Sequence, residues 1–165
     1  MVSKIISDCE QALQSGLYFA ALALALTLPD ICAKAKYPDE KSNKKRYMDW
    51  YDEYVAPWHK HPKIREDSEE LPYASGEVIY SLRCSVLHQG TPGIDSDKCD
   101  ISDFRLIWEI QEPEYLWSSS GTAPGERHLD LPIRTICKTI LDEARSYYES
   151  NMEQFNFFCY SVEER

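Results

Sequence analysis

The sequence predicts a mainly α-helical protein: a four-helix up-down bundle with a small β-hairpin inserted between its third and fourth helices. Apolar residues recur at helical spacing in four segments of the chain. Between the third and fourth segments the period shortens to two residues, which indicates strands. The length of 165 residues suits one domain that buries its own core. We therefore expect a single domain over residues 1–165.

The first predicted helix runs from Val2 to about Leu28. Its second half, Leu17 to Leu28, is almost entirely apolar, and we expect it to be a core helix enclosed by the rest of the protein. A secretory signal peptide would begin with basic residues, whereas here Asp8 and Glu10 precede the apolar stretch. A run of about twelve apolar residues is also too short to cross a bilayer. The sequence therefore predicts no membrane segment.

The second predicted helix runs from Lys41 to about Val55 and carries an aromatic stripe at i, i+3, i+4 and i+7, which we interpret as core packing. The stripe consists of Tyr47, Trp50, Tyr51 and Tyr54. The third helix spans Ser75 to Gly90, with Ser75 as its N-cap and Glu77 in its first turn, where a carboxylate complements the helix dipole. Its apolar stripe consists of Val78, Ile79, Leu82, Val86 and Leu87.

The predicted hairpin covers about residues 101–131. Apolar residues alternate at Phe104, Leu106, Trp108 and Ile110, and a shorter alternation follows at His128 to Leu131. The fourth helix, Pro132 to Ser150, keeps helical spacing throughout. The tail, about residues 152–165, is rich in aromatic residues, and we expect it to add a strand or to cover the bundle.

Charge and cysteine usage limit the classes of function. The net charge of −10 argues against a protein that coats nucleic acid nonspecifically. Residues 34–65 differ from the rest of the chain in net charge, since they hold nine of the eighteen basic residues and only five acids. Within them, Lys44, Lys45 and Arg46 form the best candidate surface for nucleic acid. The alternative interpretation is an ordinary solvated face.

The sequence predicts neither a metal site nor a cofactor. The six cysteines form no CxxC pair and no Cys/His cluster, which indicates free thiols that pack as small apolar residues, and a cytoplasmic protein. His59 and His61 form an HxH pair, but no third ligand lies nearby in the sequence. No P-loop or GxGxxG motif is present.

The candidate functional residues are Arg83 and His88, near the end of the third helix. On a regular α-helix they would lie about 7.5 Å apart along the axis and about 140° apart around it. Their side chains therefore do not share one face. They would act together only if His88 lies on the fraying last turn of the helix, or if a second copy of the helix supplies the complementary residue across a two-fold axis.

The segment Leu82-Arg83-Cys84-Ser85-Val86-Leu87-His88-Gln89-Gly90 resembles the Arg-x4-His motif of the HEPN superfamily, small helical domains of toxin–antitoxin systems, phage defence and RNA processing. The resemblance covers most of residues 2–151. It implies a metal-independent endoribonuclease with a composite site at a homodimer interface. His88 would be the general base or acid at the RNA 2′-hydroxyl, and Arg83 would hold the scissile phosphate. RNA contacts would come from Lys44, Lys45, Arg46 and Gln89.

Two features depart from the catalytic members of this superfamily. Cys84 follows the arginine, where those members usually carry a polar residue such as Asn or Asp, and residues 73–93 contain a single Lys or Arg. The alternative is a non-catalytic HEPN-like module that binds a nucleotide, RNA or a protein. An antitoxin or a nucleotidyltransferase would be the expected protein partner. A plain helical scaffold protein is the third interpretation.

Overall fold

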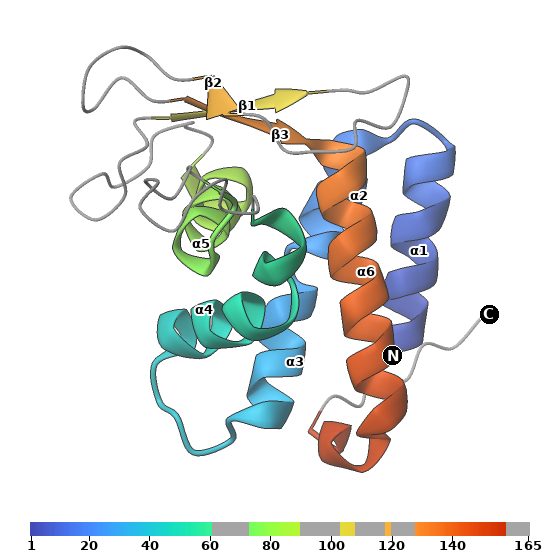
Figure 1. Ribbon diagram of the computed structural model, residues 1–165. Helices are drawn as coiled ribbons and strands as arrows, with labels where there is room; N and C mark the ends of the chain where they lie inside the picture. Colours follow the sequence, from blue (N-terminus) through green and yellow to red (C-terminus); the bar gives the residue numbers. More distant parts are fainter. Residues whose placement is uncertain (61–72, 90–102, 108–117, 120–127, 158–165) are drawn as a thin grey trace.

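The structure is a computed structural model that describes residues 1–60, 73–89, 103–107, 118–119 and 128–157. These residues are mainly helical and include a small sheet, which confirms the predicted fold class at that level. The α-helices are α1 (Val2–Gln14), α2 (Tyr18–Ala25), α3 (Leu28–Lys36), α4 (Asn43–Tyr54), α5 (Gly76–Cys84) and α6 (Ile133–Ser150). The strands are β1 (Asp103–Ile107), β2 (Ser118–Ser119) and β3 (His128–Pro132). In Figure 1, α1 and α6 stand side by side, and α4 crosses in front of α3.

The predicted first helix, Val2 to about Leu28, is two helices, α1 and α2, and α3 begins at Leu28. Gly16 adopts φ 71°, a left-handed conformation that favours glycine, directly after α1. Its N–H donates to the carbonyl of Leu13 (3.2 Å), and the N–H of Leu17 donates to the carbonyl of Ala12 (2.8 Å). This pattern is a Schellman motif, which ends a helix. The prediction of one continuous helix was therefore wrong, and the chain folds back so that α2 packs against α1.

The apolar segment is only partly enclosed. Ala21, Leu22 and Ala25 are buried, as expected of a core helix, but Leu17 and Phe19 at the start of α2 are 59% and 56% exposed. The expectation of full enclosure was thus wrong for this first turn. The stretch Tyr18–Lys36 is long and apolar enough to cross a membrane by length and composition alone, and 50% of it is buried inside the protein.

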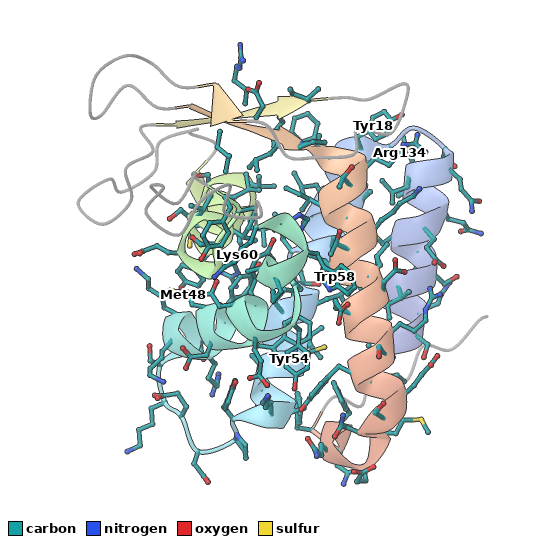
Figure 2. All side chains as sticks on the ribbon, in the orientation of Figure 1. Tyr18, Met48, Tyr54, Trp58, Lys60 and Arg134 are labelled. Atoms are coloured by element: carbon teal, nitrogen blue, oxygen red, sulfur yellow. The ribbon has the colours of Figure 1, made fainter. Side chains whose placement is uncertain are left out.

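The aromatic stripe of α4 lies in the core, as predicted. Tyr47, Trp50 and Tyr51 are fully buried. The Trp50 ring stacks on Tyr54 with centroids 5.1 Å apart and meets the edge of the Tyr147 ring of α6 at 6.0 Å. Tyr54 lies where α4 faces α6 (Figure 2). The stripe therefore joins α4 to α6.

The start of α5 is tightly fixed against α4. The Ser75 hydroxyl accepts from the N–H of Val78 (3.4 Å), which confirms the predicted N-cap. The N–H of Gly76 donates to Oδ1 of Asp52 (2.6 Å). A Cβ atom on Gly76 would lie 2.7 Å from the carbonyl oxygen of Met48 and 2.9 Å from Oδ2 of Asp52. The two helices therefore approach too closely at Gly76 for any side chain.

The variant Gly76→Ala is expected to lower the free energy of unfolding by about 1–3 kcal/mol, because the added methyl group collides with the backbone of α4. Urea denaturation followed by circular dichroism measures the change. The control is Ser81→Ala, in the same helix, for which we expect a change within about 0.5 kcal/mol. A Gly76→Ala protein as stable as the wild type would contradict the close approach of α4 and α5.

Strand pairing differs from the predicted hairpin. β1 pairs with β3 in parallel, with Asp103 opposite His128 and Ile107 opposite Pro132, and β2 adds to the other edge of β3 in antiparallel orientation. Parallel neighbours need a long connection, and residues 108–127 provide one. The prediction placed strands correctly at β1 and β3 but joined them as a hairpin, and it included no strand at Ser118–Ser119. Trp108 and Ile110 lie outside the described residues.

The sheet is joined to the helices through β3, which continues directly into α6 (Figure 1). Leu129 and Leu131 are fully buried. On β1, the Arg105 guanidinium makes a bidentate ion pair with Asp130 of β3 (2.8 and 2.9 Å). The α6 helix matches the predicted fourth helix.

The C-terminal tail covers the end of α6, one of the two roles expected for it. Met152–Phe155 forms a short 3-10 helix, and Phe155 is buried with its ring edge-on to Tyr148 at 5.0 Å. Phe157 is 40% exposed, with Nζ of Lys34 4.8 Å from its ring centroid. Residues 158–165 lie outside the described residues.

Candidate functional site

Arg83 lies in the last turn of α5 and is held by a carboxylate from α3. Its Nε–H donates to Oδ2 of Asp30 (2.9 Å), which stands 53 residues earlier in the chain. The two side chains are 22% and 29% exposed, so the ion pair is largely shielded from solvent. Burial acts to lower the pKa of the Arg83 guanidinium, but the Asp30 carboxylate and the Cys84 side chain together raise this pKa above its ordinary value. Arg83 is therefore a fixed cation.

Tyr80, one turn before Arg83, lies against two cations. The centroid of its ring is 5.7 Å from Cζ of Arg83 and 5.8 Å from Nζ of Lys44. Lys44 comes from the first turn of α4 and also reaches Oε1 of Glu77 (3.5 Å). Two residues that the sequence proposed separately, Lys44 and Arg83, are thus brought to the same aromatic ring by the packing of α4 on α5.

Tyr47 completes the support beneath this ring. It is fully buried, its ring meets the Tyr80 ring edge-on at 5.4 Å, and its hydroxyl donates to the carbonyl of Leu26 (3.3 Å). Burial raises the pKa of Tyr47 well above its ordinary value, so it stays a neutral hydroxyl. We refer below to Asp30, Lys44, Tyr47, Tyr80 and Arg83 as the Arg83 cluster.

The other two basic residues of α4 have carboxylate or carbonyl partners of their own. Nζ of Lys45 is 2.6 Å from Oδ2 of Asp49, whose hydrogen bond raises the pKa of Lys45. Arg46 donates to the carbonyl of Glu40 (2.6 Å) and to the side chain of Asn43. Of the three basic residues of α4, only Lys44 contacts the other members of the Arg83 cluster among the described residues.

The backbone between Arg83 and His88 is irregular. α5 ends at Cys84, and Ser85–Gln89 continues it as a π-helix, η2, whose i→i+5 hydrogen bonding makes each turn one residue wider. On such a turn, a residue five positions further on returns toward the same side. The separation of about 140° around a regular α-helix therefore does not apply to this segment. The side chains of His88 and Gln89 lie outside those the structure describes.

The structure describes only the first member of the HxH pair. His59 is buried, its Nε2 has no hydrogen-bond partner among the described residues, and burial lowers its pKa to about 4. His61 lies outside the described residues. Within the part of the chain that the structure describes, no three His, Cys, Asp or Glu side chains gather as metal ligands.

The cysteines behave as predicted where they are described. Cys9, Cys32 and Cys137 are free and buried, and Cys84 is free and half-buried. Cys99 and Cys159 lie outside the described residues. Burial raises the pKa of the Cys32 thiol well above its ordinary value, so it packs as an apolar side chain.

Two residues of the cluster were missed by sequence reasoning. Asp30 follows Pro29 at a point where an acidic residue breaks the long apolar segment, which is the signal of a new helix start. Tyr80 precedes Arg83 by three residues and therefore shares its helical face. Its residue type alone did not distinguish it from the other aromatic residues of the chain.

No protein-family model matches the chain, and no curated protein and no solved structure matches it.

Proposed function

We propose that the protein is a HEPN-like, metal-independent endoribonuclease of the toxin–antitoxin or phage-defence type, acting in the cytoplasm as a homodimer. The observation that carries this proposal is the placement of Lys44 and Arg83 against one ring. A lone arginine on α5 is a weak RNA-binding surface, whereas two cations beside an aromatic ring provide phosphate contacts and a platform next to the motif.

The proposed chemistry divides between two side chains. Arg83 binds the scissile phosphate and stabilises the charge that develops on it in the transition state. His88 accepts the proton of the 2′-hydroxyl or donates one to the leaving oxygen, because imidazole is the side-chain group whose ordinary pKa lies nearest neutral pH. Within one chain the two residues do not lie on a single regular helix, because α5 gives way to η2 between them. Gln89, also in η2, is proposed as a further RNA contact.

The bundle order supports the resemblance. Under this proposal, α1 to α3 together, α4, α5 and α6 would correspond to the four HEPN helices, with the motif at the end of the third and the sheet inserted before the fourth. In the proposed dimer, each site combines Arg83 of one subunit with His88 of the other. An antitoxin or a nucleotidyltransferase is the partner proposed for this surface.

The test is RNA cleavage in the presence of EDTA. We expect the wild type to cleave, and Arg83→Ala and His88→Ala each to lower kcat/KM by at least about 100-fold, as loss of an acid–base or charge-stabilising group does. The matched control is Arg105→Ala, which removes an arginine that is paired with Asp130 on the sheet. Circular dichroism verifies folding. Cleavage that survives both motif substitutions would remove Arg83 and His88 from the mechanism.

A mixing experiment tests the composite site. Inactive Arg83→Ala and His88→Ala chains are combined and allowed to exchange subunits. If each site takes one residue from each subunit, a mixed dimer has one intact site and the mixture recovers about a quarter of wild-type activity. If both residues come from one subunit, no activity returns. The outcome therefore separates a shared site from two independent ones.

The non-catalytic alternative is favoured by a specific observation. Lys44, Lys45 and Arg83 are each paired with a carboxylate: Glu77, Asp49 and Asp30 respectively. Pairing lowers the net positive charge offered to RNA. A binding module would leave RNA intact while binding it in a salt-dependent way, measured by fluorescence anisotropy of a labelled RNA. Growth arrest on expression, relieved by Arg83→Ala, would instead indicate a toxin.

A further inference from the structure

Asp30 is fixed by the local structure of α3. Leu28 and Pro29 open this helix and are buried, and the proline ring restricts the backbone just before Asp30. The N–H of Ile31 donates to the carbonyl of Thr27 (3.3 Å), so the helical bonds begin at this point. The Asp30 carboxylate therefore extends from a rigid helix start rather than from a loop.

The guanidinium of Arg83 lies between two groups from different helices. Nε donates to the Asp30 carboxylate, and the Tyr80 ring lies beside Cζ. A free arginine side chain loses rotamer entropy when it is ordered. In this protein both contacts exist without RNA, so the Arg83 side chain is already ordered before RNA binds.

The support closes into a ring of contacts. Tyr80 is braced by Tyr47, and the Tyr47 hydroxyl donates to the carbonyl of Leu26, four residues before Asp30. The same α2–α3 segment therefore fixes Arg83 from one side through Asp30 and supports it from the other through Tyr47 and Tyr80. Such a closed network holds a polar side chain in one orientation.

We propose that Asp30 is a positioning residue of the RNA-cleaving site: its carboxylate holds the Nε–H of Arg83 and orients the guanidinium for the scissile phosphate before RNA binds. This inference rests on the proposed ribonuclease function. Its physical basis is that a pre-oriented cation stabilises the transition state without reorganisation during the reaction. Asp30 touches neither phosphate nor 2′-hydroxyl and acts through Arg83.

The test compares kcat and KM for RNA cleavage by Asp30→Ala, Asp30→Asn and wild type. We expect Asp30→Ala to lower kcat between about tenfold and about 100-fold, as misplacement of a reacting group does. KM is expected to change far less than kcat. Asparagine keeps an oxygen that accepts from Nε–H, so Asp30→Asn is expected to recover part of the loss. In an Arg83→Ala background, Asp30→Ala should cause no further loss of kcat.

The matched control is Asp130→Ala, which breaks the other Asp–Arg pair described here, on the sheet with Arg105. It removes a carboxylate and an ion pair but should leave kcat at the wild-type value. If wild-type protein cleaves RNA and Asp30→Ala retains full kcat, or loses it equally with Arg83 already removed, Asp30 has no positioning role and the proposed function stands. Absence of cleavage by the wild type overturns the proposed function and with it the role of Asp30.

Discussion

Replacing Trp50 by alanine is expected to lower the free energy of unfolding by about 3–5 kcal/mol. Trp50 is fully buried, stacks on Tyr54 at 5.1 Å and meets Tyr147 edge-on at 6.0 Å, so the substitution leaves a cavity between α4 and α6. A loss of this size is a large fraction of the stability of a single domain. Chemical denaturation followed by far-ultraviolet circular dichroism measures it.

The chain supplies a matched control at Trp58, which is 71% exposed. For Trp58→Ala we expect a change within about 0.5 kcal/mol, since the same side chain is deleted without a buried cavity. Equal effects at the two positions would contradict the assignment of Trp50 to the core. Trp50→Phe should lie between wild type and Trp50→Ala, because it retains one ring of the stack.

Acidification is expected to destabilise the protein through His59. Burial lowers the pKa of this imidazole from 6.5 to about 4, so the folded protein keeps it neutral while the unfolded chain binds a proton. The contribution of neutral His59 to the free energy of unfolding is therefore fully present above about pH 6.5. It is lost as the pH drops toward about 4, by roughly 3 kcal/mol in all. Unfolding free energies measured in urea at several pH values between these limits test the slope.

The comparison is with His59→Leu, which removes the titrating group. Its stability should depend less on pH over the same range, and the difference between wild type and variant should grow steadily as the pH falls. Near pH 7 the variant should lose little stability, since it also removes a buried imidazole nitrogen that has no hydrogen-bond partner within the described part of the chain. Parallel pH profiles for the two proteins would rule out His59 as a source of acid sensitivity.

Local patterns in the sequence were sufficient for elements whose residues repeat regularly. α4 and α6 were predicted nearly to their ends, because an apolar stripe at helical spacing is visible within one segment. The break between α1 and α2 depends on a single residue, Gly16, and uniform apolar character after it conceals the turn. The parallel pairing of β1 with β3 depends on the path of the connecting chain, which periodicity does not specify.

In the candidate site too, local features could be predicted from the sequence and long-range contacts could not. Arg83 and His88 form a local motif, and both were identified from one short stretch of sequence. Asp30, the partner of Arg83, was not identified, because it lies 53 residues away in the sequence. Their contact arises only when α3 and α5 pack in the same domain. The π-helix η2 was not predicted, since its widened geometry has no simple signature in residue types.

The late position of α6 in the chain has a consequence for biosynthesis. α2 and α3 both pack against α6, which begins only at Ile133, directly after β3. While the ribosome is still making the middle of the protein, Leu22 and Ala25 therefore lack the surface that later helps to cover them. The most apolar segment of the nascent chain therefore stays partly uncovered until α6 has emerged.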